Sequence, residues 1–378
     1  MSENWLAELN IPVITDRHYW FVRTSGGSHY EDFVMHNYIA IGWDYISVSA
    51  LLNSSEDTIK RLIEFNETIA PENEFDQEDP PDSESEELSE KNKSSVKKAV
   101  SLIYNKINRF VNEFHDGDIV LVPSRNSDFI SIGVLVGPVY EDATYVQKYY
   151  QDNPLTELCL CPFHKRRKVR WLKHISKPDL DVFLARAISA QHSVSCIDDF
   201  AWLINRSVYD IYATDDHLHT TIHAGHPNGL SFAELKDFVN SMDDGLSMMA
   251  NAMGIEYRPD EMDVKIMIHS PGILEICALI ATSGLVLSAL IFSLNHYRHG
   301  GKTKLSFKLN IAGQELEFNA EDESPGTTTH LQNEKKLELE KLDRLIALQE
   351  RLGIEYPELN FTELASLARK SEDPVDKS

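Results

Sequence analysis

Short runs of apolar and β-branched residues, bounded by Gly, Pro, Asn or Asp, recur in the first part of the chain and predict β-strands. Three of them cover residues 39–43, 119–123 and 130–136, which is the length typical of strands. Two helical patterns interrupt them, near residues 56–69 and from about 96 to 114, with apolar residues three and four positions apart. Strands that close around one or two helices predict a small mixed barrel in a protein of the α+β class.

The middle of the chain, residues 178–258, is mostly helical in pattern. Ser231 is followed three positions later by Glu234, the spacing of a capping box that begins a helix. This helix is expected to run to about Met253. We therefore expect a helical connector after the barrel.

A long apolar run, residues 276–294, follows the connector. Its nineteen residues carry no charge, and this length is within the range for one membrane span. Arg298, Lys302, Lys304 and Lys308 come directly after it, whereas positive residues prefer the cytoplasmic side of a membrane. The pattern therefore favours a buried or oligomerising hydrophobic helix over a membrane span, and a conditionally inserting helix remains an alternative.

The C-terminal part begins with a hairpin pattern, because residues 302–311 and 314–321 alternate around Ala312 and Gly313. A flexible stretch follows, and then a charged amphipathic helix over residues 334–352 whose apolar stripe suits a partner helix. The predicted organisation has four segments: the barrel domain (1–177), the helical connector (178–258), the hydrophobic helix with its β-hairpin (259–320), and the flexible segment, amphipathic helix and tail (321–378).

Acidic residues outnumber basic ones, and the formal net charge is −24. This argues against a protein that coats nucleic acid along its whole surface, so any such contact must be a local basic patch. Residues 72–90 hold ten Asp or Glu and no Lys or Arg. We expect residues 71–93 to form a disordered acidic insertion. It is a solvated loop in the simpler interpretation and a nucleic-acid mimic covering a binding face in the other.

Cysteine usage and the N-terminus predict a cytoplasmic protein. Four cysteines in 378 residues make no disulfide framework, and the first ten residues lack the basic start and apolar core of a signal peptide. Association with an inner membrane through residues 276–294 is the alternative location.

A basic run closes the barrel domain and is a candidate for phosphate contact. Seven cations fall within thirteen residues, with Trp171 among them: Lys165, Arg166, Arg167, Lys168, Arg170, Lys173 and Lys177. Cations on a nucleic-acid surface displace condensed counterions, which favours binding. The alternative is a solvated strand edge protected by its charge.

Three stretches resemble one known domain type: YWFVRTSGGSHYEDFVMHNYIAIGW (19–43), GDIVLVPSRNSDFISIGVLVGPVY (117–140) and RRKVRWLKHI (166–175). Their order and spacing are similar to the PUA/EVE-like barrel at the front of Mrr-type and other modification-sensing restriction and anti-phage proteins. The resemblance covers roughly the first 175 residues. It implies a nucleic-acid sensor.

The resemblance also implies a base-binding pocket made of aromatic rings and polar groups. A base taken out of its stack regains roughly 1–3 kcal/mol for each aromatic contact. By this resemblance the rings are Trp20, Tyr30 and Trp43, and the polar partners are Arg23, Ser124 and Arg125. For Trp20 and Trp43 the alternative is ordinary core packing.

Metal binding and catalysis have weaker signals. His217, His219 and His223 lie within the stretch DDHLHTTIHAGH. They are weak metal candidates, because their spacing matches no metalloenzyme motif and a polar loop explains them as well. Residues 259–265 are similar to a PD…(D/E)xK nuclease core, but the two acidic positions nearly overlap. We therefore expect no catalytic residues, no cofactor and no enzyme activity.

These observations predict a bacterial-type defence sensor that binds modified or foreign nucleic acid, most readily DNA, through its barrel. Its C-terminal unit would form a homo-oligomer or act on a membrane. The second hypothesis is a membrane-associated interaction protein whose barrel binds a small nucleotide signal or a protein partner. A metal-dependent nuclease or hydrolase is the third.

Overall fold

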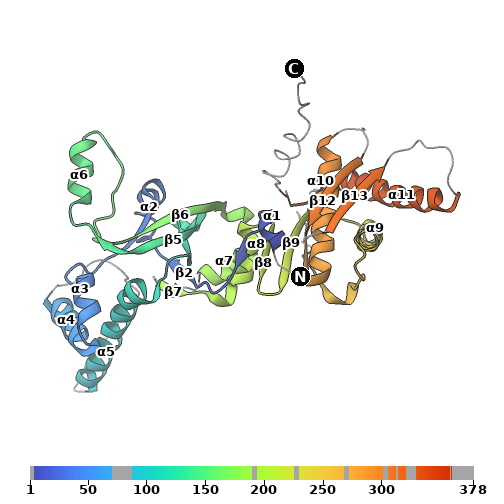
Figure 1. Cartoon of the computed structure of the whole chain (residues 1–378). Coiled ribbons are helices and arrows are strands. Elements are labelled where there is room, and N and C mark those ends of the chain that lie inside the picture. The colour runs from blue at the N-terminus through green and yellow to red at the C-terminus, as the bar shows by residue number, and fades with distance from the viewer. Residues whose placement is uncertain are drawn as a thin grey trace. The chain divides into compact units, whose positions relative to one another are not determined.

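The computed structural model divides the chain into two compact units (Figure 1). The half-barrel unit is Asp16–Val208, and the layered unit combines Met1–Thr15 with Tyr209–Ser378. The predicted boundaries at 177, 258 and 320 do not coincide with this division, because the predicted connector contributes elements to both units. The structure describes residues 4–69, 87–189, 194–224, 230–267, 272–300, 305–311, 314–320, 329–357 and 359.

The half-barrel unit is built on a six-stranded curled sheet. All neighbours are antiparallel except β2 and β4, which are parallel. The predicted strands near 39–43, 119–123 and 130–136 are therefore confirmed as members of one sheet. Its strands, in spatial order, are β3 (Tyr38–Ile41), β6 (Lys165–Ser176), β5 (Phe129–Glu141), β4 (Ile119–Pro123), β2 (Tyr19–Val22) and β7 (Val194–Cys196).

Both faces of this sheet are covered, which explains why its strands are apolar at consecutive positions. Alternate residues such as Val120 and Val122 belong to a core with helices α2–α5, and we call this side the α2 face. Ile119 and Leu121 belong to a second core on the opposite side, with α7 and α8. The helices of the unit are α2 (Tyr30–His36), α3 (Val48–Asn53), α4 (Glu56–Ile69), α5 (Glu87–Asn108), α6 (Tyr145–Asp152), α7 (Val182–Ser189) and α8 (Ala201–Val208).

The predicted acidic insertion lies partly inside a helix. Helix α5 begins at Glu87 and continues into a π-helical turn at Arg109–Glu113, so residues 87–93 are helical and the predicted boundary at 93 is wrong. Residues 71–86 lie outside the described residues.

The layered unit places helices on one face of a second six-stranded sheet. The capping box of Ser231 and Glu234 is confirmed at the start of its helix α9. Its strands are β1 (Val13–Ile14), β8 (Ile211–Thr214), β9 (His217–Ala224), β10 (Met262–Met267), β11 (Gly272–Leu279) and β14 (Ile354–Glu355). Its helices are α1 (Asn4–Glu8), α9 (Phe232–Met253), α10 (Leu285–Gly300) and α11 (Thr329–Leu352), and the predicted hairpin is β12 (Leu305–Ile311) with β13 (Gln314–Ala320).

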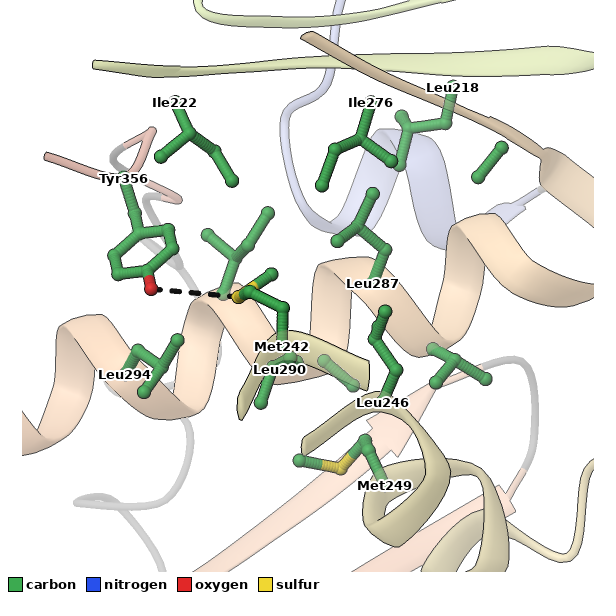
Figure 2. Close-up of a cluster of buried hydrophobic side chains, with 14 of the residues drawn as sticks. Leu218, Ile222, Met242, Leu246, Met249, Ile276, Leu287, Leu290, Leu294 and Tyr356 are labelled. Atoms are coloured by element: carbon green, nitrogen blue, oxygen red, sulfur yellow. Dashed lines mark hydrogen bonds between the residues drawn. The ribbon is translucent and has the colours of Figure 1, made fainter. Parts of the chain in front are cut away.

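The long apolar run is not one helix, and this expectation is corrected. Residues 276–279 end strand β11, a π-helical turn occupies Ile280–Gly284, and α10 begins only at Leu285. In Figure 2, Leu287 and Leu290 of α10 lie among side chains of the sheet and of α9. Among the described residues, no helix is long and apolar enough to cross a membrane. The run is apolar because it crosses the core of its own unit.

The apolar stripe of the predicted amphipathic helix is also apolar because it is buried in the core of the layered unit. Leu342, Leu345, Leu348 and Leu352 of α11 are buried in the core formed with α9 and α10. The helix therefore packs its apolar stripe against partner helices of its own unit, α9 and α10, as the sequence pattern predicted.

Candidate nucleic-acid interface

A chain of hydrogen bonds joins three side chains on the α2 face of the half-barrel sheet. Tyr30, the first residue of α2, bonds through its hydroxyl to Ser131 Oγ at 2.6 Å, and Ser131 Oγ bonds to His174 Nδ1 at 2.7 Å. Ser131 is 0% exposed, whereas His174 is exposed. The chain therefore runs from the interior of the sheet to an imidazole at the surface.

Strand pairing positions this chain. Ser131 on β5 and His174 on β6 are direct partners in the antiparallel ladder, so both side chains leave the sheet on the same side. The imidazole Nε2 has no hydrogen-bond partner among the residues that the structure describes. One edge of the ring is thus fixed by the protein, and the other can donate or accept a hydrogen bond to a ligand.

Trp171 lies beside His174 on the same face, with the ring centroids 6.2 Å apart. A Cβ at Gly133 would lie 2.8 Å from Trp171 Cε3 and 2.4 Å from Val169 Cγ1, so only glycine leaves room for the indole. Trp171 Nε1 is buried and has no hydrogen-bond partner in the described part of the chain. Leaving such a donor without a partner costs about 1–3 kcal/mol, and a ligand acceptor would recover this energy only if the indole shifted towards the surface.

Two tight turns meet at the rim of this face. The turn after β2 contacts the turn between β4 and β5, since a Cβ on Gly27 would lie only 2.3 Å from the backbone N and Cα of Arg125. Thr24 Oγ1 donates to the Pro123 carbonyl at 2.7 Å and joins the same two turns. Arg125 is exposed at this rim. So is Lys177, whose amide donates to the Asp128 carbonyl at 2.8 Å.

Some of the predicted pocket residues come together here. Tyr30, Ser124 and Arg125 lie on or beside the two turns, although the hydroxyl of Ser124 closes its own turn by accepting from the Phe129 amide at 2.8 Å. Trp43 is half-buried, with Lys106 Nζ 5.8 Å from its ring centroid. The structure does not bring Trp43 into contact with the hydrogen-bonded chain.

Trp20 and Arg23 lie elsewhere. Trp20 is buried, stacks on Phe114 at 4.3 Å, and donates from Nε1 to Asp118 at 2.8 Å, so it has the core packing that was the alternative. Arg23 has its guanidinium carbon 5.7 Å from the ring centroid of Phe21. Because Phe21 belongs to the core opposite the α2 face, Arg23 lies on the other side of the sheet from Tyr30.

Three of the seven cations of the basic run are inside the protein, which conflicts with the phosphate contacts predicted for them. Lys165, Arg166 and Arg167 are 0%, 1% and 4% exposed. Lys165 Nζ donates to the carbonyls of Trp43 and Ile46 at 2.9 and 3.0 Å. These buried cations hold strand β6 to the surrounding loops and helices and are not available to a ligand.

The two buried arginines have protein partners of their own. Arg166 lies over the rings of Tyr38 and Tyr145, at 4.3 and 3.8 Å, and donates to the Cys161 carbonyl at 2.9 Å. Arg167 donates to the carbonyls of Phe110 and Val111 at 2.8 and 3.0 Å. Burial lowers the pKa of Arg167 to about 10, so it remains charged at neutral pH.

Lys168 and Arg170 of the run are exposed, but they alternate along β6 with Val169 and Trp171. They therefore lie on the face opposite the hydrogen-bonded chain. Their contact with nucleic acid stays a prediction.

Ser131 and His174 were not predicted from the sequence. The only available signal was a single polar residue, Ser131, inside the apolar run 130–136. Nothing in the sequence relates Ser131 to a histidine 43 residues away, because the strand register that joins them is a tertiary feature.

The histidine cluster of the layered unit, whose residues were weak metal candidates, has protein partners for each of its three imidazoles. His219 stacks on Tyr212 at 4.7 Å and its Nε2 bonds to Thr214 Oγ1 at 2.8 Å. His217 bonds to Asp216 at 2.6 Å, and His223 to Asp210 at 3.3 Å. Within the described ranges, the ring nitrogens of these three histidines do not lie close enough together to bind one metal ion. Each imidazole has its own protein partner instead.

Comparison with known proteins gives one partial match. Residues 71–195 match the model of a family described as a domain of unknown function, DUF8426. This range contains β4, β5 and β6, and hence Ser131, Trp171 and His174, but not Tyr30. No curated protein and no solved structure gives a match. The match therefore covers strands β4, β5 and β6 of the half-barrel sheet and leaves β2 and β3 outside it.

Proposed function

We propose that this chain is a defence-type sensor whose half-barrel unit binds a modified or foreign base in nucleic acid, DNA being the first candidate. The observation that carries the proposal is the chain from Tyr30 through Ser131 to His174, next to the unpartnered Nε1 of Trp171. Together they offer a fixed imidazole edge, an indole donor and aromatic rings on one face.

This arrangement suits a nucleobase for two physical reasons. The edge of a base carries donors and acceptors in its plane. The exposed His174 Nε2 would complement them directly, and the buried Trp171 Nε1 would do so after a shift of the indole. Its flat face gains roughly 1–3 kcal/mol by stacking on an aromatic side chain. A chemical modification at the base edge would change the hydrogen bonds it can make, and this would make the site selective.

The rim of the site supplies positive charge for the sugar-phosphate backbone. Arg125 and Lys177 are exposed there, in a protein whose net charge is −24. Two local cations give weak, salt-dependent affinity for phosphate without general attraction to nucleic acid. Binding should therefore depend on the base more than on the length of the strand.

The test is binding of the full chain to labelled oligonucleotides, measured by fluorescence anisotropy, with unmodified cytosine, 5-methylcytosine or 5-hydroxymethylcytosine in an otherwise constant sequence. His174→Ala should weaken binding of the preferred oligonucleotide at least tenfold. His115→Ala is the matched control, because His115 is an exposed histidine of the same unit that takes no part in the hydrogen-bonded chain, and the affinity of this variant should stay within twofold.

Two outcomes would remove the proposal. One is that the wild-type chain binds none of the oligonucleotides, and the other is that His174→Ala binds them as well as the wild type does. Competition by free nucleoside monophosphates at low micromolar concentration would favour the second hypothesis, a small nucleotide signal.

We propose that the output of the sensor is a change of oligomeric state when the half-barrel unit is occupied, made through surfaces other than the buried apolar run and the buried stripe of α11. Light scattering of the full chain with and without the preferred oligonucleotide measures this directly. An unchanged molar mass of the protein component in both samples would contradict an oligomerising output.

A further inference from the structure

A second cluster of reactive side chains lies at the edge of the half-barrel sheet, away from the hydrogen-bonded chain. It consists of His18, Cys196 and Asp198, and one donor atom from each lies within 4.8 Å of the other two. Strand pairing produces it: Trp20 and Cys196 are antiparallel partners in β2 and β7. His18, two residues before Trp20, therefore comes opposite Asp198, two residues after Cys196.

The carboxylate of Asp198 is the centre of the cluster. Its Oδ2 is 2.8 Å from His18 Nδ1, its Oδ1 accepts from the Tyr19 amide at 2.6 Å, and it bonds to the thiol of Cys196. This differs from a nucleophilic triad, in which the imidazole lies between the nucleophile and the carboxylate. Here the thiol faces the acid instead of the base, so the arrangement does not prepare Cys196 as a nucleophile.

Asp118 fixes the surroundings of the cluster. Its carboxylate accepts from the backbone amide of His18 at 3.1 Å, from that of His115 at 2.9 Å and from Trp20 Nε1 at 2.8 Å. The bond to the His18 amide fixes the backbone that carries the His18 imidazole before an ion arrives. The side chains of His18 and Cys196 are exposed, so an ion and a water molecule can reach them.

We propose that His18, Cys196 and Asp198 bind one divalent transition-metal ion, zinc in preference, with water as the fourth ligand. Thiolate, imidazole and carboxylate are the three ligand types of zinc, and three protein ligands plus water complete its tetrahedral shell. A site containing a thiolate disfavours magnesium and calcium, which prefer oxygen ligands only. The ion would displace the thiol proton of Cys196 and the proton between His18 and Asp198.

The site would have a structural consequence for the half-barrel. Strand β7 has three residues and is an edge strand of the sheet. An ion held by His18 on one side and by Cys196 and Asp198 on the other would fasten β7 to β2. The proposal is independent of base binding, because it uses none of the residues of the α2-face chain.

Cobalt(II) titration of the reduced full chain, purified without metal-affinity resin, tests the proposal. The wild type should take up about one Co²⁺ per chain, with the visible bands of a tetrahedral ion and a near-ultraviolet thiolate-to-cobalt band, and zinc should abolish both signals. Cys196→Ser should lose the thiolate band and bind at least tenfold more weakly. Cys159→Ser is the matched control, since Cys159 is also an exposed free thiol, and it should behave as the wild type does.

Asp198→Asn gives a second test, which removes the carboxylate ligand and leaves the thiol in place, and circular dichroism confirms the fold of each variant. It should keep a thiolate band but bind Co²⁺ more weakly. No uptake of Co²⁺ by the wild type at micromolar concentration would overturn the proposal. So would a thiolate band that survives in Cys196→Ser or disappears in Cys159→Ser.

Discussion

Ser131 and His174 are cross-strand partners whose side chains share a hydrogen bond of 2.7 Å on one face of the half-barrel sheet. Ser131 also bonds to Tyr30, so one buried hydroxyl supports two residues of the candidate interface. This makes Ser131 a positioning residue: its own hydroxyl is buried, and it acts through the imidazole and the phenol.

Replacing Ser131 should therefore affect stability and binding together. Ser131→Ala leaves the Tyr30 hydroxyl without its partner, and we expect the free energy of unfolding to fall by about 1–3 kcal/mol. Urea denaturation followed by circular dichroism measures this. Ser131→Thr keeps the hydroxyl and should recover most of the oligonucleotide affinity that Ser131→Ala loses. Equal affinity of the alanine and threonine variants would argue against a positioning role.

Stability measurements can distinguish the buried cations of the basic run from the exposed ones. Arg166→Met removes the charge that lies over two tyrosine rings and leaves carbonyls unsatisfied, and we expect a loss of about 3–5 kcal/mol. Lys168→Ala, on the same strand but exposed, should change stability by no more than about 0.5 kcal/mol. If both variants unfold at the wild-type denaturant concentration, Arg166 is not held as described.

His29 should make the half-barrel sensitive to acid. The side chain is buried, its Nδ1 has no hydrogen-bond partner within the described residues, and burial lowers its pKa below the usual 6.5. As pH falls below about 6.5, the unfolded chain takes up a proton that the folded chain resists, so stability decreases towards the lowered pKa.

The measurement is the urea midpoint at pH 7.5, 6.5 and 5.5 for the wild type and His29→Gln. The variant should lose less stability over this range than the wild type does. Because the other histidines are common to both proteins, the difference between the two profiles isolates His29. Parallel profiles would contradict a lowered pKa.

The apolar run gives a prediction for the layered unit. Leu290 is fully buried between helices and sheet, so Leu290→Ala should reduce the free energy of unfolding by about 2–5 kcal/mol. Phe232→Ala is the control, because Phe232 is apolar and highly exposed. A helix that is solvent-exposed until it enters a membrane would show no such difference.

The local patterns of the sequence predicted the regular elements well. Apolar runs located the strands around Ile39, Ile119 and Ile130, and Ser231 with Glu234 located the start of α9. These features depend on residues close together in the chain.

The sequence-based predictions that were wrong, and the features that were not predicted, depend on tertiary contacts. Residues 276–294 are apolar in a buried strand followed by a buried helix, and composition alone does not separate that arrangement from one long helix. The sequence alone suggests that Arg167 is a surface cation, because its acceptors, the carbonyls of Phe110 and Val111, are brought to it only by the fold. Cys196 and His18 are 178 residues apart, and only the pairing of β7 with β2 brings them together.

The space that Gly133 leaves for the Trp171 indole defines a sequence signature. Other chains with the same arrangement of Ser131, Gly133, Trp171 and His174 could be recognised by it. Any side chain at position 133 would push the Trp171 indole off the sheet, so the glycine, the serine two positions before it and the tryptophan–histidine pair on the neighbouring strand must occur together. The pattern is S-x-G on one strand and W-x-x-H on its antiparallel partner, with serine and histidine in register. A relative that carries alanine in place of this glycine would have to rebuild the face, and it would recognise a different ligand or none.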